Sequence, residues 1–194
     1  MTSLARRIAE SRDDIADPFD NYRNTRHVNR SDMLRIFGPA LAPVLRPNEI
    51  PEGLVEREAR WTLQYLGVPT SIRDSVVTNP RGMVPISHFL TGMELPAWAK
   101  SDSVLMLGLF PDGFLCLDGI NGSVLLLTRD LQAEPIKLAD DLTSFVSTLV
   151  EISEATARRP RPSEREVRTL TVQLGHISHG ALEAWERMIR SLME

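Results

Sequence analysis

Three short apolar runs separated by glycine turns, at residues 103–128, restrict the fold more than any other part of the chain. The runs SVLMLGLF, FLCLD and SVLLLT are joined at Asp112-Gly113 and Asn121-Gly122, where glycine reaches positive φ without steric cost. Connections this short require antiparallel neighbours, because a parallel crossover needs a dozen or more residues. A fourth run, EPIKLA, alternates apolar and polar residues, which is typical of a half-exposed strand. The sequence therefore predicts a β-meander at about 103–139.

Helical patterns on both sides of the meander are expected to cover the sheet. The first three strands are apolar on both faces, so both faces need cover. Helices are expected at about 53–66, at about 140–157, from Ser163, and in HGALEAWERMIRSLM at the C-terminus. Prolines make 67–102 irregular, with short strands near 83–86 and 88–90. The predicted fold class is α+β, with a central, mainly antiparallel sheet flanked by helices.

Length and composition predict one soluble domain. A chain of 194 residues, 42% of them hydrophobic, suits a single core, assigned to 31–194 after a polar N-terminal arm at 1–30. No apolar run approaches the ~18–20 residues of a membrane span, and the N-terminus lacks the apolar region of a secretory signal. The single cysteine excludes an intrachain disulfide. We expect a reduced, cytoplasmic protein without a membrane partner.

The net charge of −4 is distributed unevenly along the chain. Residues 61–157 hold 5 basic and 11 acidic side chains, whereas residues 1–60 are balanced. An acidic central segment argues against binding along the phosphate backbone of a nucleic acid, so no nucleic-acid partner is expected. The same charge suits a basic partner.

No motif predicts an active site. Asp112 and Asp118 stand at opposite ends of one short strand, where Asp before Gly is a common turn choice and paired-carboxylate chemistry is not expected. His176 and His179 form an HxxH that could bind a metal, but no glutamate is placed as in HExxH. Cys116 is interpreted as a buried, inert thiol. We expect no catalytic residue, no cofactor and no metal.

The order of motifs along the chain is similar to that of a known family. Phe37-Gly38, IPEGL at 50–54 and a helix ending in YLGVP at 65–69 come first. LGLF, FLCLD, SVLLL, DLTSFVSTLVEI and LEAWERMIRSLM follow, so the likeness spans roughly 33–193. This order resembles the SUKH superfamily, and more specifically its fourth family of bacterial immunity proteins. VEREARWT after IPEGL departs from the family pattern, and the arm at 1–30 has no counterpart.

The resemblance implies a non-enzymatic immunity protein of a polymorphic toxin system, a form of toxin–antitoxin pairing. Such proteins bind and neutralise a cognate toxin domain, often a nuclease or deaminase. The acidic centre adds the hypothesis that an acidic face mimics nucleic acid against a basic toxin. The candidate partner-binding residues are Trp98, Asp112, Asp118, Glu134, Asp140 and Asp141.

Alternatives remain open for these residues and for the function. Core packing is the alternative for Trp98, and solvated helix or turn caps are the alternative for the last three acids. A scaffold or regulatory protein with the same fold is the second functional hypothesis. A metal-dependent hydrolase using His176 and His179 is a remote third. The toxin, the contact face and the oligomeric state are not determined by the sequence.

Overall fold

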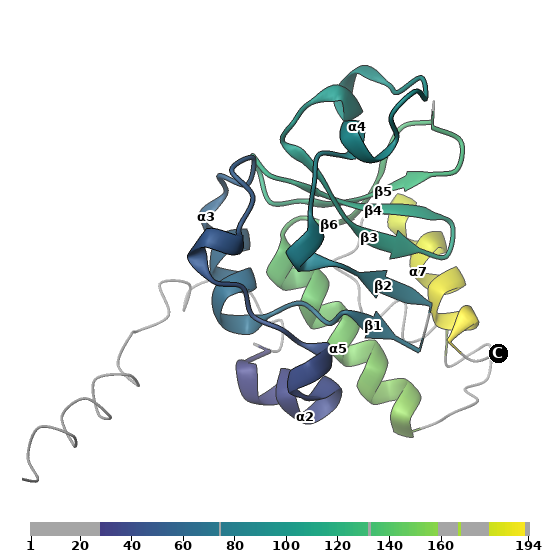
Figure 1. Cartoon of the computed structure of the whole chain (residues 1–194). Helices are drawn as coiled ribbons and strands as arrows, with labels where there is room; N and C mark the ends of the chain where they lie inside the picture. The colour runs from purple at the N-terminus through teal and green to yellow at the C-terminus, as the bar shows by residue number, and fades with distance from the viewer. Residues whose placement is uncertain (1–27, 74, 132, 159–166, 168–178, 193–194) are drawn as a thin grey trace, which may run out of the picture.

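A six-stranded antiparallel sheet forms the centre of the molecule (Figure 1). The computed structural model describes residues 28–73, 75–131, 133–158, 167 and 179–192. Every strand pairs with its neighbours in sequence, so the predicted meander is confirmed. The strands are β1 (Ser71–Ile72), β2 (Val76–Thr78), β3 (Val104–Phe110), β4 (Gly113–Asp118), β5 (Val124–Thr128) and β6 (Ile136–Ala139). The first two strands lie in the segment predicted to be irregular. They were not predicted because strands of two and three residues are too short to show the alternation of apolar and polar side chains.

Helices and helical turns surround the sheet. The α-helices are α2 (Arg30–Leu41), α3 (Arg57–Trp61), α4 (Ile86–Phe89), α5 (Leu142–Arg158) and α7 (His179–Ser191). The remaining helical turns are the 3-10 helices η1 (Pro47–Glu49), η3 (Pro80–Gly82) and η4 (Ala97–Lys100) and the π-helix η2 (Thr62–Leu66). The predictions of α5 and α7 are confirmed, together with the α+β class. The helix predicted from Ser163 lies outside the described residues.

The first predicted helix begins later than expected. It was predicted at about 53–66, but α3 starts at Arg57 and continues directly into η2. The Glu56 carboxylate accepts hydrogen bonds from the backbone N–H groups of Glu58 and Ala59, which marks the helix start. The N–H of Val55 is instead bonded to the carbonyl of Gly119. This tertiary hydrogen bond therefore holds Val55 outside the helix that the apolar periodicity predicts.

One face of the sheet packs against α5 and α7, which lie behind it in Figure 1. Trp185 of α7 is fully buried in this main core, and its Nε1 donates to the carbonyl of Leu138 at 3.2 Å. The Trp185 ring also meets Phe110 edge-on and Phe145 at a tilt. These contacts join β3, β6, α5 and α7 in one cluster.

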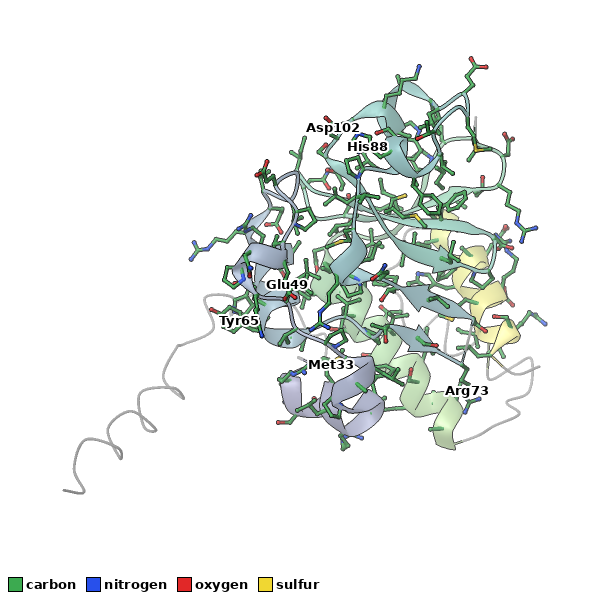
Figure 2. All side chains as sticks on the ribbon, in the orientation of Figure 1. Met33, Glu49, Tyr65, Arg73, His88 and Asp102 are labelled. Atoms are coloured by element: carbon green, nitrogen blue, oxygen red, sulfur yellow. The ribbon has the colours of Figure 1, made fainter. Side chains whose placement is uncertain are left out.

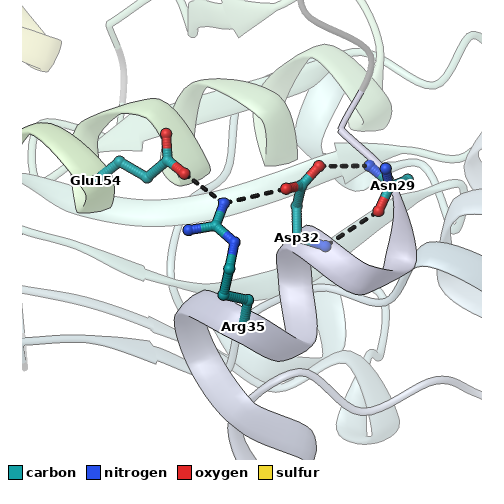
Figure 3. A network of polar contacts seen from close by, with 4 residues as sticks. All are labelled: Asn29, Asp32, Arg35 and Glu154. Atoms are coloured by element: carbon teal, nitrogen blue, oxygen red, sulfur yellow. Dashed lines mark hydrogen bonds and ion pairs between the residues drawn. The ribbon is translucent and has the colours of Figure 1, made fainter.

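A polar network holds α2 against α5 (Figure 3). Asn29 and Asp32 form a reciprocal capping box at the start of α2. The Arg35 guanidinium donates to both Asp32 and Glu154, so it joins the two helices. The hydrogen bond with Glu154, and then that with Asp32, raises the pKa of Arg35.

The opposite face of the sheet is covered by the short α4 and η4. Their apolar side chains form a second core with residues of β3, β4 and β5: Ile86, Leu90, Leu95, Ala99, Val104, Met106, Cys116 and Leu127. The strands predicted near 83–86 and 88–90 are wrong, because this segment forms α4 and meets the sheet through a single bridge between Pro85 and Leu105. Proline lacks the N–H that would extend a ladder. The cover is incomplete, since Val77 and Leu109 remain 41% and 47% exposed.

Candidate functional site

The described residues give no support for a metal centre or for a cysteine nucleophile. Among them, no group of three or more His, Cys, Asp and Glu side chains is placed to hold a metal ion. His176 lies outside the described part of the chain, and His179 is described only as the start of α7. Cys116 is buried on β4, and burial raises the pKa of its thiol to about 12. The thiolate that a nucleophile needs is therefore absent at neutral pH.

A hollow of about 480 Å³ lies between α2, β1 and the end of α5. Its charged groups are engaged within the protein. Arg35 is paired with Glu154, and the Arg73 guanidinium donates to the carbonyls of Thr156 and Leu192. These bonds fasten the surrounding elements together and leave no acid–base pair for chemistry in the described lining.

The acidic residues predicted to bind a partner are divided between the two ends of the sheet. Asp112 lies in the β3–β4 turn, whereas Asp118 ends β4 beside the start of β3. Glu134 precedes β6 at the Asp112 end, because β6 runs antiparallel to β5. Asp140 and Asp141 follow β6 at the Asp118 end. The structure therefore does not bring all five together.

At the Asp112 end, one acid is paired and the other is exposed. The Asp112 carboxylate accepts a hydrogen bond from Nε of Arg187, which joins the β3–β4 turn to α7. Glu134 is exposed on the segment before β6. Asp112 consequently has a structural role in addition to any role toward a partner.

At the other end, three acids make local bonds. Asp118 accepts from the N–H of Ile120 at 2.9 Å and orders the turn after β4. Asp140 lies 3.3 Å from Nζ of Lys137. Both carboxylate oxygens of Asp141 accept from Ser144, one from its N–H at 2.6 Å and one from its hydroxyl at 2.8 Å. Asp141 is thus the N-terminal cap of α5.

Trp98 lies in η4 and is half-buried against the second core. Its Nε1 is buried and has no hydrogen-bond partner among the described residues. A buried donor without an acceptor costs free energy, so this indole is held by apolar packing rather than by polar contacts. The partner anchor predicted at Trp98 remains a prediction.

Three loops meet at the Asp118 end of the sheet, and we call residues 51–57, 101–103 and 118–122 together the loop end. Gly119 joins them: its carbonyl accepts from the N–H groups of Val55 and Glu56 at 2.8 and 2.9 Å, and its N–H donates to Ser103 at 2.7 Å. A Cβ on Gly119 would lie 2.2 Å from the carbonyl oxygen of Gly53. Only glycine allows this approach.

Two apolar side chains project from the loop end. Val55 and Ile120 are each 65% exposed, more than any other large apolar side chain among the described residues. Sequence reasoning missed this pair, because Val55 was counted within a helix. Ile120 did carry a signal: an apolar residue occupies the centre of the turn Asp-Gly-Ile-Asn-Gly, where polar residues are usual.

Carboxylates accompany these apolar side chains. The loop end carries four acidic residues, Glu52, Glu56, Asp102 and Asp118, against the single base Arg57. Asp102 and its neighbour His88 are labelled in Figure 2, with 3.9 Å between the Asp102 carboxylate and Nε2 of His88. The arrangement is an apolar tip surrounded by negative charge, which is suited to binding a partner.

Comparison with known proteins assigns the chain to a family. A family model described as SUKH-4 immunity protein matches residues 28–185, which include the whole sheet, α5 and part of α7. No curated protein and no solved structure gives a match. None of the described helices is long and apolar enough to cross a membrane. Since the matched region exceeds half of the 194 residues, the chain belongs to the SUKH-4 immunity protein family.

Proposed function

We propose that this protein neutralises a cognate toxin domain by stoichiometric binding and acts without enzymatic turnover. The observation that carries the proposal is the match to an immunity family over residues 28–185. The buried thiol of Cys116, with its raised pKa, is in keeping with a role that needs no nucleophile. The proposed place of action is the cytoplasm.

The proposed toxin is basic, as a nuclease or deaminase that binds nucleic acid would be. Acids at both ends of the sheet would imitate phosphates: Asp112, Asp118, Glu134, Asp140 and Asp141, with Trp98 as an apolar anchor. Glu134 and Asp140 suit this role best, because they are exposed. Asp141 suits it least, because both of its oxygens cap α5.

Co-expression with any toxin domain encoded beside the gene tests the proposed function. We expect the protein to restore growth of cells that produce the toxin, and a 1:1 complex to elute from size exclusion. A toxin that stays fully active with an excess of the protein would contradict neutralisation. The absence of any toxin-like reading frame beside the gene would favour the scaffold or regulatory alternative.

Salt dependence tests the electrostatic part separately. The Debye length, beyond which salt screens the interaction between exposed charges, is ~3 Å at 1 M salt and ~8 Å at physiological ionic strength. The affinity for the toxin domain is therefore expected to fall between 0.15 and 1 M NaCl. An affinity that is unchanged at 1 M would exclude imitation of nucleic acid while leaving the immunity role intact.

A further inference from the structure

We propose that the loop end is the docking surface for the toxin, and that Val55 and Ile120 enter an apolar recess in a basic protein surface. This inference rests on the proposed function and specifies which face carries it. It narrows the electrostatic proposal above: the contact is made at the Asp118 end of the sheet, so Asp112 and Glu134, at the other end, lie outside it, and apolar side chains supply its centre.

Exposed apolar area is the first argument. Val55 and Ile120 come from different loops, 65 positions apart, yet the hydrogen bonds of Gly119 with Val55 and Glu56 bring those loops together. Each side chain leaves 65% of its surface open. Removing apolar area from water is favourable, so covering both side chains favours association.

Rigidity of the loop end is the second argument. The Asp118 carboxylate holds the turn by accepting from the N–H groups of Ile120 and Asn121. The Asn121 side chain in turn accepts from the N–H of Ser123 at 2.9 Å. The Ile120 side chain is consequently presented on a turn that is fixed on both sides. A surface that is already ordered loses little conformational entropy when it binds.

Charge identifies the occupant. Four carboxylates against Arg57 give the loop end a net negative charge, which complements a basic protein surface and repels anionic lipid and nucleic acid. A second copy placed symmetrically on this surface would bring the same carboxylates together, so self-association is disfavoured. A polar rim around an apolar centre is the usual composition of a protein interface.

The partly covered sheet face is the competing surface. Val77 and Leu109 pair across β2 and β3 and remain open, and Phe89 stacks edge-on against Phe114 nearby. The exposed fractions of Val77 and Leu109 are lower than those of the loop-end pair. None of these four residues is charged, so they do not indicate which kind of partner would bind to this face. This face therefore supplies control positions.

Four variants separate the two surfaces: Ile120→Arg and Val55→Arg at the loop end, Ile120→Leu as the matched conservative change, and Leu109→Arg on the sheet face. The probe is any toxin domain that is encoded beside the gene, inactivated at its catalytic residue and titrated calorimetrically. We expect Ile120→Arg and Val55→Arg each to weaken binding by about tenfold or more, as loss of a central interface contact does. Ile120→Leu and Leu109→Arg should bind as the unaltered protein does.

The outcomes distinguish this inference from the proposed function. If the unaltered protein fails to bind the toxin domain, the proposed function fails. If it binds and Leu109→Arg weakens binding while Ile120→Arg does not, the loop end is not the docking surface and the immunity role stands. Circular dichroism of each variant confirms folding, which is expected because all three altered side chains are exposed.

Discussion

Replacing Gly119 with alanine is expected to destabilise the protein by about 2–3 kcal/mol, because the new methyl group would overlap backbone atoms that cannot move independently. The added Cβ would lie 2.2 Å from the carbonyl oxygen of Gly53 and 2.9 Å from that of Ser103. Real Cβ contacts are essentially never shorter than 3.0 Å. The loops must therefore separate.

The magnitude follows from the bonds that separation would break. Three backbone hydrogen bonds converge on Gly119, from Val55, from Glu56 and to Ser103. Each contributes roughly 0.5–1.5 kcal/mol net, so losing all three costs about 3 kcal/mol. Alanine offsets roughly 0.4–1 kcal/mol of this by restricting the unfolded chain. The remainder is large against a typical total stability of roughly 5–15 kcal/mol.

Urea unfolding, followed by tryptophan fluorescence, measures the effect. Ile120→Ala is the matched control: it alters the next residue, keeps all three hydrogen bonds and shortens a side chain that is 65% exposed, so its unfolding free energy should change by less than about 0.5 kcal/mol. If Gly119→Ala were as stable as this control, the close approach of the three loops would be refuted.

Three further changes test other parts of the structure. Trp98→Phe should leave stability unchanged or raise it by up to about 1 kcal/mol, since Nε1 has no acceptor in the described part of the chain; a larger loss in urea unfolding would contradict this. Cys116 should not react with a thiol reagent at pH 8 until urea is added, and immediate reaction would refute its burial. Its folded pKa of about 12 exceeds an unfolded value near 9, so the unfolded state releases its proton first. Stability should therefore fall as pH rises from about 9 toward 12, by at most roughly 1.4 kcal/mol per pH unit, and less steeply in Cys116→Ala. Asp141→Ala should cost about 1 kcal/mol in thermal unfolding through loss of the α5 cap, whereas Asp140→Ala should cost little.

Local signals explain which elements could be predicted. The runs of β3 to β6 are bounded by turns within a few residues, so pairing between sequence neighbours needs no long-range information. The apolar stripe of α5 similarly identifies the face that meets the sheet. β1 and β2 escaped prediction because they are too short to show alternation, and the segment predicted as short strands at 83–86 and 88–90 instead forms α4 after Pro85.

Local signals explain less of the candidate site than of the fold. Asp112 and Asp118 were placed at opposite ends of one strand from their spacing alone, and the structure has them there. The partner of Asp112 was beyond sequence reasoning, because Arg187 comes from α7. Asp118 instead accepts from the N–H groups of Ile120 and Asn121 in its own turn, as an Asp before Gly predicts. Val55 was assigned to a helix from its periodicity, which takes no account of the carbonyl of Gly119 that its N–H reaches.

The sequence by itself determined the antiparallel meander, the long helices beside it and the family to which the chain is similar. Those features depend on residues close together in the chain, where turn chemistry and periodicity act directly. Only the tertiary structure decided that Gly53, Ser103 and Gly119 meet, and that the exposed Val55 and Ile120 therefore lie on adjoining loops. Such a meeting depends on backbone hydrogen bonds between distant segments, and backbone groups are the same in every residue, so no side-chain pattern records their partners.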